Sequence, residues 1–363
     1  MERKKQENAV DSCRSILRMI REYRTPDKTH PLIREALLED LCEKTKQVST
    51  SERSALLAEG LYYSAPERIR ELFHEDDFSA SKLASLPRHD KQVVNVGFVT
   101  LIKPELQALL VALRRSPDDQ DFISHGPFRY WSGRLPVLER GDCTYVATMV
   151  GKPRNVPCAL AMQNLVANYS VDLLVLVGIA AGPRSQVKLG DAVPVERVLD
   201  YEHVRSELDG DKIVEKWRPE LPDIDQDVQN DLQFIDEQRF RTRFSDCLHR
   251  IPDSWLPQKV ERKEICPSIK RGTSAAGERL FADGRLEEMV SMRDQRIRAG
   301  DQEDSGFALA CEFSKKKWVI FRGIADYGDP NKEDGWHAVA SLSAACAALD
   351  FLVNAYRSPP ASF

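Results

Sequence analysis

The sequence has few of the features that would place a protein in a membrane, outside the cell or on a nucleic acid. None of its apolar runs approaches the ~20 residues of a membrane span, and the longest, VDLLVLVGIAAG, contains Asp172. The charged start, MERKKQENAV, lacks the apolar stretch of a secretory signal. A formal net charge of −5 gives no electrostatic reason to bind nucleic acid. We therefore expect a cytoplasmic protein that binds neither a membrane nor a nucleic acid.

Paired cysteines and the common nucleotide-binding signatures are also missing. The eight cysteines are scattered as single residues, with no CxxC motif and no His/Cys cluster. This pattern predicts reduced thiols and argues against disulfides and a zinc site. The sequence contains neither the GxGxxG motif of dinucleotide-binding proteins nor a P-loop.

What is present divides into two parts. Residues 1–90 carry apolar residues at helical spacing and two S-x-x-E capping boxes, Ser49 with Glu52 and Ser64 with Glu67. We interpret them as a small all-α domain for self-association or for binding a protein partner, because no pair of its residues suggests chemistry. The stretch SLPRHDK (85–91) is a predicted linker.

The second part, 91–357, alternates strands with helices. Such alternation, with strands that are apolar on both faces, predicts an α/β domain whose sheet is covered by helices on both sides. A charged, proline-containing segment at 200–265 is expected to be a surface insertion with some helix. The predicted strands are 93–100, 144–151, 172–178 and 317–324, and the predicted helices are 104–115, 157–169 and a last helix from Trp336.

Four segments combine small or acidic residues with the ends of these elements. Glu105 follows the first strand, either as a favourable charge in the first turn of a helix or as a carboxylate at the edge where α/β enzymes place their sites. The glycine-containing VGIAAG (177–182) is either a tight strand exit or a loop that lets a flat ligand approach the backbone. Glu303, in DQEDSGFALAC, is either a solvated residue before a helix or an acceptor for a vicinal diol. Asp326 ends the last strand, where it either caps a turn or acts as a general acid.

Together these segments resemble the nucleoside phosphorylase/nucleosidase superfamily over roughly 93–353. The resemblance is strongest to the branch that includes methylthioadenosine/S-adenosylhomocysteine nucleosidase. RGIADYGDPNKEDGWHAVASLSAACAALDFL (322–352) is similar to the phosphorylase-type domains fused to helical modules in fungal NLR-like proteins and bacterial anti-phage effectors. The resemblance implies a twisted mixed central sheet flanked by helices, and cleavage of a purine N-glycosidic bond.

The resemblance also assigns roles. Asp326 matches the aspartate that protonates purine N7, and Glu303 matches the second glutamate of the family's E-M-E-A motif, which binds ribose hydroxyls. That motif reads DQED here, so Asp301 and Gln302 depart from it and the sugar contacts near Gln302 are affected. The small loop that lines base and sugar matches Gly178, Ile179 and Ala180, and the purine-facing residue is Leu280 or Phe281, which the spacing does not separate.

Two departures from the phosphorylase pattern favour hydrolysis. A phosphate nucleophile requires arginines and a hydroxyl, and the corresponding loop of bacterial hexameric phosphorylases resembles R-V-G-S. Here the loop reads LVGI, with Leu176 and Ile179 in place of the arginine and the serine. Glu105 stands where the nucleosidases carry the glutamate that orients the attacking water. Neither a metal nor an organic cofactor is needed for this reaction.

The substrate is expected to be a purine nucleoside or nucleotide, with adenine as the default base. Four basic residues near the expected mouth are candidate phosphate contacts or ordinary solvated side chains: Lys103, Lys152, Arg154 and Arg184. A nucleotide-depleting defence effector that assembles as a homo-oligomer is the hypothesis by analogy. The alternatives are a phosphate-dependent phosphorylase and a degenerate module that senses a nucleotide without cleaving it.

Overall fold

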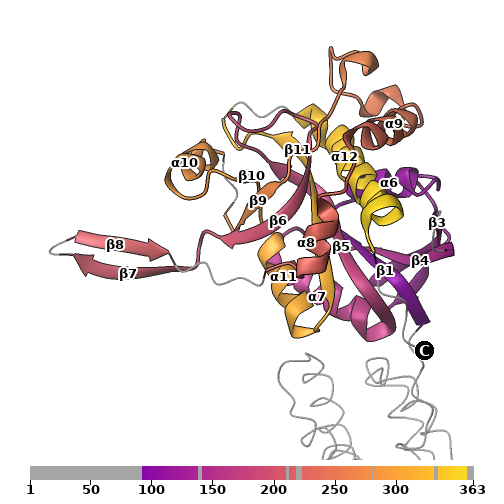
Figure 1. Ribbon diagram of the computed structural model, residues 1–363, viewed down its shortest axis with the longest axis horizontal. Helices are drawn as coiled ribbons and strands as arrows, with labels where there is room; N and C mark the ends of the chain where they lie inside the picture. The colour runs from indigo at the N-terminus through magenta and orange to yellow at the C-terminus, as the bar shows by residue number, and fades with distance from the viewer. Residues whose placement is uncertain are drawn as a thin grey trace, which may run out of the picture. The chain divides into compact units, whose positions relative to one another are not determined.

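The computed structural model describes residues 92–137, 141–209, 212–217, 223–279, 282–330 and 334–357. All of them belong to one compact unit of the chain, Lys91–Phe363 (Figure 1). The predicted all-α domain (1–90) and two predicted substrate contacts, Leu280 and Phe281, lie outside the described residues.

The core of this unit is a nine-stranded mixed sheet, as the sequence predicts. Its strand order is β10-β9-β6-β11-β5-β1-β4-β3-β2. Neighbouring strands run parallel except at β6–β11, β3–β4 and β2–β3. The strands are β1 (Gln92–Thr100), β2 (Ile123–His125), β3 (Phe128–Val137), β4 (Gly141–Met149), β5 (Tyr169–Ala181), β6 (Ala192–Asp200), β9 (Gly272–Ala276), β10 (Ile297–Asp301) and β11 (Lys317–Asp326).

The sheet curls back on itself at one end. Although β10 is the last strand in the order, it also pairs with β5, where Gly300 lies opposite Ala181. The strands β5, β11, β6, β9 and β10 therefore close into a ring. This closure brings the end of β10 against the middle of β11, although the two strands are not neighbours in the sheet.

Helices cover both faces of the sheet (Figure 1). Successive residues of a strand face opposite sides, and β11 shows the consequence. Arg322 contacts Asp304 of one helical layer, whereas a Cβ on Gly323 would lie 1.8 Å from the carbonyl oxygen of Ala340 in the other. The helices are α6 (Lys103–Ala112), α7 (Asn155–Asn168), α8 (Gln226–Leu232), α9 (Glu237–Leu248), α10 (Arg285–Met292), α11 (Asp304–Phe313) and α12 (His337–Asp350).

The last helix, α12, contacts β5, β6 and β11 on one side and α6 and α9 on the other. Residues 339–352 are therefore buried all round, unlike an amphipathic surface helix, which buries one stripe. With the π-helical turn Phe351–Ala355 that follows, this segment is long and apolar enough to cross a membrane by length and composition alone. Since 83% of it is buried inside the unit, its apolar character belongs to the core.

The segment 200–265 contains two different structures. A hairpin of β7 (Val204–Asp209) and β8 (Lys212–Trp217) forms its own two-stranded sheet and extends away from the body (Figure 1). In contrast, α8 and α9 add buried apolar side chains to the core, including Val228, Phe240 and Phe244. The predicted surface insertion therefore describes the hairpin, whereas α8 and α9 are more buried than their charged sequence suggests.

Candidate active site

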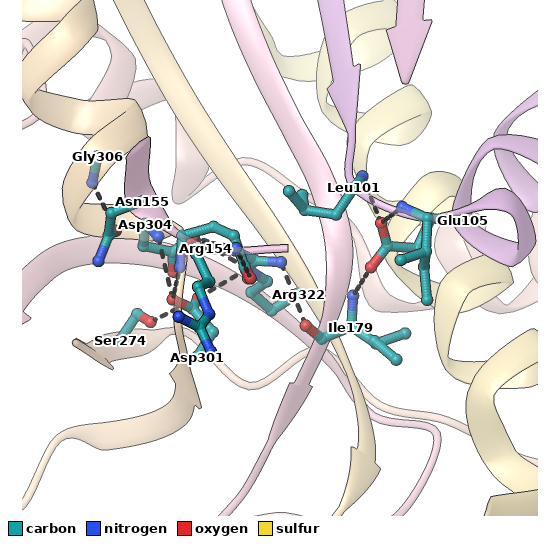
Figure 2. A network of polar contacts seen from close by, with 12 residues as sticks. Leu101, Glu105, Arg154, Asn155, Ile179, Ser274, Asp301, Asp304, Gly306 and Arg322 are labelled. Atoms are coloured by element: carbon teal, nitrogen blue, oxygen red, sulfur yellow. Dashed lines mark hydrogen bonds and ion pairs between the residues drawn. The ribbon is translucent and has the colours of Figure 1, made fainter. Parts of the chain in front are cut away.

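The candidate site is organised around one buried arginine. Arg322 lies in the middle of β11 and is fully buried. Its Nη2 lies 2.5 Å from Oδ1 of Asp304, its Nε lies 2.9 Å from Oδ2 of Asp301, and its Nη2 lies 3.5 Å from Oε2 of Glu303. Figure 2 shows this cluster between β11 and the start of α11. A buried charge requires such partners, because desolvation without them costs several kcal/mol.

Asp301 fixes the segment that carries these acids. Its Oδ1 accepts the backbone N–H groups of Glu303 and Asp304, both at 3.0 Å. This satisfies two of the unpaired donors at the start of α11. The run Asp301–Asp304 thus leaves β10 as a tight turn with three carboxyl groups directed at Arg322.

On the other side of Arg322 lies the glycine of the predicted base loop. Gly178 of β5 is in register with Arg322, and a Cβ there would lie 2.4 Å from Nη1 of Arg322 and 2.8 Å from Oε1 of Glu105. Its neighbour Ile179 bonds to both groups: its N–H donates to Glu105 at 2.9 Å, and its carbonyl accepts from Arg322 at 3.2 Å. Gly178 is therefore required for the close approach of the arginine and the glutamate.

Glu105 lies in the first turn of α6, beyond the carboxyl end of β1, and is buried. Its Oε2 accepts the backbone N–H groups of Leu101 and Ile102 at 2.6 and 3.1 Å. It thus caps its own helix and, through Ile179, also reaches β5 (Figure 2). Burial raises the pKa of Glu105 to about 7 against the opposing effects of Arg322 and the N–H donors. A carboxyl that titrates near neutrality is suited to accept a proton during a reaction.

The pKa values of the acids around Arg322 are shifted in different directions. Burial raises the pKa of Asp301 well above its ordinary value, and the neighbouring Asp304 and Glu303 add to the rise. Burial also raises the pKa of Glu303, although Arg322 opposes it. For Asp304 the effect of burial is outweighed by the charge of Arg322 and by hydrogen bonds from Asp301 and Arg322, so its pKa is lowered. The two neighbouring aspartates are thus shifted in opposite directions, the pKa of Asp301 upward and that of Asp304 downward.

Asp326 is half-buried at the end of β11. Its Oδ1 accepts the N–H of Gly328 at 2.7 Å, and its carbonyl accepts the N–H of Gly182 at 2.9 Å. Asp326 therefore caps the following turn through its Oδ1, as one of the two sequence interpretations expects. Because β1, β5 and β11 run parallel as neighbours, Asp326 lies at the same sheet edge as Glu105 and the end of β5. Its role as a general acid stays a prediction.

The remaining predicted contacts differ in how close they come to this cluster. Arg154 donates its backbone N–H to Oε1 of Glu303 at 2.9 Å, and its side chain is exposed, as is that of Lys152. The amide of Gln302 donates to the carbonyl of Glu278. Ala180 is buried in β5 beside Ile179.

Two of the four candidate phosphate contacts have other partners. Lys103 is 71% exposed and lies 3.9 Å from Asp118. Arg184 pairs with Asp329 at 2.9 Å, and its guanidinium lies 3.9 Å from the ring centroid of Tyr327. A phosphate at either position would compete with an existing partner.

The sequence interpretation overlooked Arg322 and Asp304. A usable signal was present: Arg322 is the one charge in WVIFRGI, and a buried strand can hold a charge only if the fold supplies counterions. The acidic run DQED, already singled out by its resemblance to the family motif, could supply those counterions. Assigning it as the partner of Arg322 would have predicted that the start of α11 contacts β11.

Known proteins were compared with this chain. The family model of the phosphorylase superfamily matches residues 96–354. ATP nucleosidase Cap17 of Escherichia coli (strain KTE188) is 25% identical over 300 residues, which cover 81% of this chain and 57% of the relative. The chain thus spans about half the length of that curated relative.

Solved structures share the fold. A 5′-methylthioadenosine/S-adenosylhomocysteine nucleosidase from Neisseria meningitidis, in complex with methylthio-immucillin-A, aligns with a TM-score of 0.50 at 15% identity, covering 71% of this chain and 99% of that one. The corresponding enzyme from Colwellia psychrerythraea 34H, in complex with adenine, aligns with a TM-score of 0.50 at 17% identity, covering 72% and 95%.

The raised pKa of Glu105 predicts a pH-dependent stability. The folded state binds this proton up to about pH 7, whereas an unfolded glutamate loses it near 4.5. The resulting stabilisation is full below the unfolded pKa and is lost as the pH rises through 7. Between pH 5 and 8 the unfolding free energy of the wild type should fall by about 2 kcal/mol more than that of Glu105→Gln, as measured by urea denaturation at each pH.

The comparison uses the change of the unfolding free energy with pH, so a pH-independent effect of the new amide on stability cancels. Glu312→Gln, which changes an exposed glutamate of α11, should keep the wild-type slope. Equal slopes for Glu105→Gln and the wild type would contradict the assignment.

Proposed function

The chain belongs to the phosphorylase superfamily, and we propose that it hydrolyses the N-glycosidic bond of a purine nucleoside or nucleotide and releases the free base. The observation that carries the choice of hydrolysis is the charge around Ile179. Among the described residues Arg322 is the one buried cation, and carboxyl groups of Asp301, Glu303 and Asp304 already surround it. This buried cation is therefore already compensated and is not free to hold an orthophosphate nucleophile.

The same charge distribution suits a cationic transition state. Departure of a purine leaves positive charge on the ribose. Preorganised carboxylates in a site that excludes water stabilise such a charge. Glu303 and Glu105 supply it from the two sides of Arg322. In this proposal Asp326 donates a proton to N7 of the base, so that the bond between C1′ and N9 breaks and the base leaves neutral.

Water completes the reaction. Glu105, in its ionised form, accepts a proton from the water whose oxygen bonds to C1′, and the products are free base and free sugar. Because Glu105 titrates at about 7, the hydrolytic rate should rise as the pH passes through that value. Glu303 binds the two ribose hydroxyls.

Asp326→Asn tests the proposal. The purified wild type should release free base from at least one of ATP, AMP, adenosine and methylthioadenosine without added phosphate. Asp326→Asn should lower that rate by at least ~10²-fold, in line with the loss of a general acid. Asp329→Asn is the matched control in the same turn and should stay within about threefold of the wild type.

Other outcomes identify the alternatives. Base release that requires phosphate would make the protein a phosphorylase. No release from purine or pyrimidine substrates, with binding retained, would make it a nucleotide-sensing module. Full activity of Asp326→Asn would remove this residue from the mechanism.

A nucleotide is the proposed form of the substrate. The curated relative is named an ATP nucleosidase, and two exposed cations, Lys152 and Arg154, precede α7. The backbone N–H of Arg154 donates to Glu303, so Arg154 lies next to the proposed sugar contact. Arg154 has a φ of 106°, a strained conformation for a non-glycine residue that recurs at functional sites.

Arg154→Ala separates nucleotides from nucleosides. The variant should raise KM for AMP and ATP by about tenfold or more, the effect of losing one charge-assisted contact, and leave KM for adenosine unchanged. Arg114→Ala is the matched control, because Arg114 is another exposed arginine with a positive φ, at the far end of α6. A loss of equal size on adenosine would show that Arg154 supports the site without contacting phosphate.

The wider role follows from the same proposal. An enzyme that removes adenine from ATP would deplete the nucleotide pool, which suits an effector that is activated on demand. Assembly into a homo-oligomer, and a trigger that acts through residues 1–90, remain predictions from the sequence.

A further inference from the structure

The ion pairs of Arg322 are unequal, and the proposed sugar carboxylate has the weakest one. Oδ1 of Asp304 lies 2.5 Å from Nη2 and 2.9 Å from Nε of Arg322. Oε2 of Glu303 lies 3.5 Å from Nη2. Charge-assisted N–H···O contacts are typically ~2.7–2.9 Å. Asp304 therefore forms a strong ion pair with the guanidinium, whereas the contact of Glu303 is long and weak.

This division leaves Glu303 with unused acceptor capacity. Its Oε1 receives the backbone N–H of Arg154, and its Oε2 has the long contact with Arg322. The backbone N–H of Gln302 is a further donor to this carboxylate. An ionised carboxylate accepts about four hydrogen bonds. Glu303 is buried, and burial raises its pKa. Two more donors, such as the hydroxyls of a diol, would compensate its charge.

Asp304 itself is an expensive residue for a purely structural role. It is fully buried, Arg322 holds its Oδ1, and Asp301 and Ser274 lie close enough to lower its pKa. An alanine costs no desolvation, whereas a buried carboxylate costs several kcal/mol unless it is paired.

We propose that Asp304 is a positioning residue, which holds the guanidinium of Arg322 away from Glu303 so that Glu303 remains available to both hydroxyls of the ribose. The inference rests on the proposed function and specifies how the same site selects a ribosyl substrate. Without Asp304, Nε of Arg322 would keep its contact with Asp301. Nη2 would lose its short contact and turn to Oε2 of Glu303, which lies 3.5 Å away. That pairing would occupy the oxygen that the diol needs.

The test compares substrates with and without the diol. Adenosine and 2′,3′-dideoxyadenosine, or the corresponding nucleotides if only these are cleaved, are assayed for base release with the wild type, Asp304→Asn, Asp304→Ala and Glu303→Gln. For Asp304→Asn, kcat/KM should fall about tenfold or more on the ribosyl substrate, as expected when a buried hydrogen-bonded contact is lost, and stay within about threefold on the dideoxy substrate. Glu303→Gln should show the same selective loss, and Asp304→Glu should restore part of the selectivity.

Three other results would contradict either the inference or the proposed function. Equal losses on the two substrates, or failure of all Asp304 variants to fold as judged by thermal unfolding, would make Asp304 structural and overturn the inference. A wild type that does not distinguish the two substrates would remove Glu303 as the diol contact and overturn it as well. A wild type that releases base from neither of them nor from any nucleotide would overturn the proposed function instead.

Discussion

The guanidinium of Arg322 is the interaction on which the rest of the site depends. A charge in the middle of the buried strand β11 is stable only because Asp301, Glu303 and Asp304 arrive from the end of β10. That arrival requires the sheet to close, so that β10 pairs with β5. It also requires Gly178, because any side chain there would separate Arg322 from Glu105. Removing the arginine would therefore leave several acids buried without a counterion.

Much of this architecture could be predicted from the sequence. The strand of β5 was recognisable because VDLLVLV is a continuous apolar run of the kind found in strands covered on both faces. Glu105 and Asp326 were identifiable as residues at strand ends. The predicted loop at Gly178, Ile179 and Ala180 is wrong in one respect, because these residues continue β5, which runs on to Ala181 and pairs with β11. The match to the phosphorylase superfamily over residues 96–354 confirms the resemblance that those segments carry.

The parts that could not be predicted depend on contacts between distant segments. No local pattern indicates that Gly300 lies opposite Ala181, and without that pairing DQED reads as a solvated turn. The short strand β10 contains IRAGD, too few residues for a clear alternation. The titration of Glu105 near neutrality is likewise a result of burial between α6 and β5, which the sequence of α6 alone does not reveal.

The charge of the site distinguishes hydrolysis from phosphorolysis better than the family name does. Arg322 is already paired with carboxyl groups, so it is not free to hold a phosphate anion. In the proposed reaction, ionised Glu303 and Glu105 would instead stabilise the developing ribosyl cation. Leu176 is fully buried in β5, and Ile179 offers only its backbone. The loop that binds phosphate in the phosphorylases it resembles is therefore an apolar wall here.

The central claim is tested most directly by the chemical identity of the sugar product. The wild type would be supplied with its purine substrate in phosphate buffer, and the products would be followed by ³¹P NMR and mass spectrometry. The account predicts a free sugar with a C1 hydroxyl and no sugar 1-phosphate, even when phosphate is in large excess. Accumulation of a sugar 1-phosphate in step with the free base would contradict it.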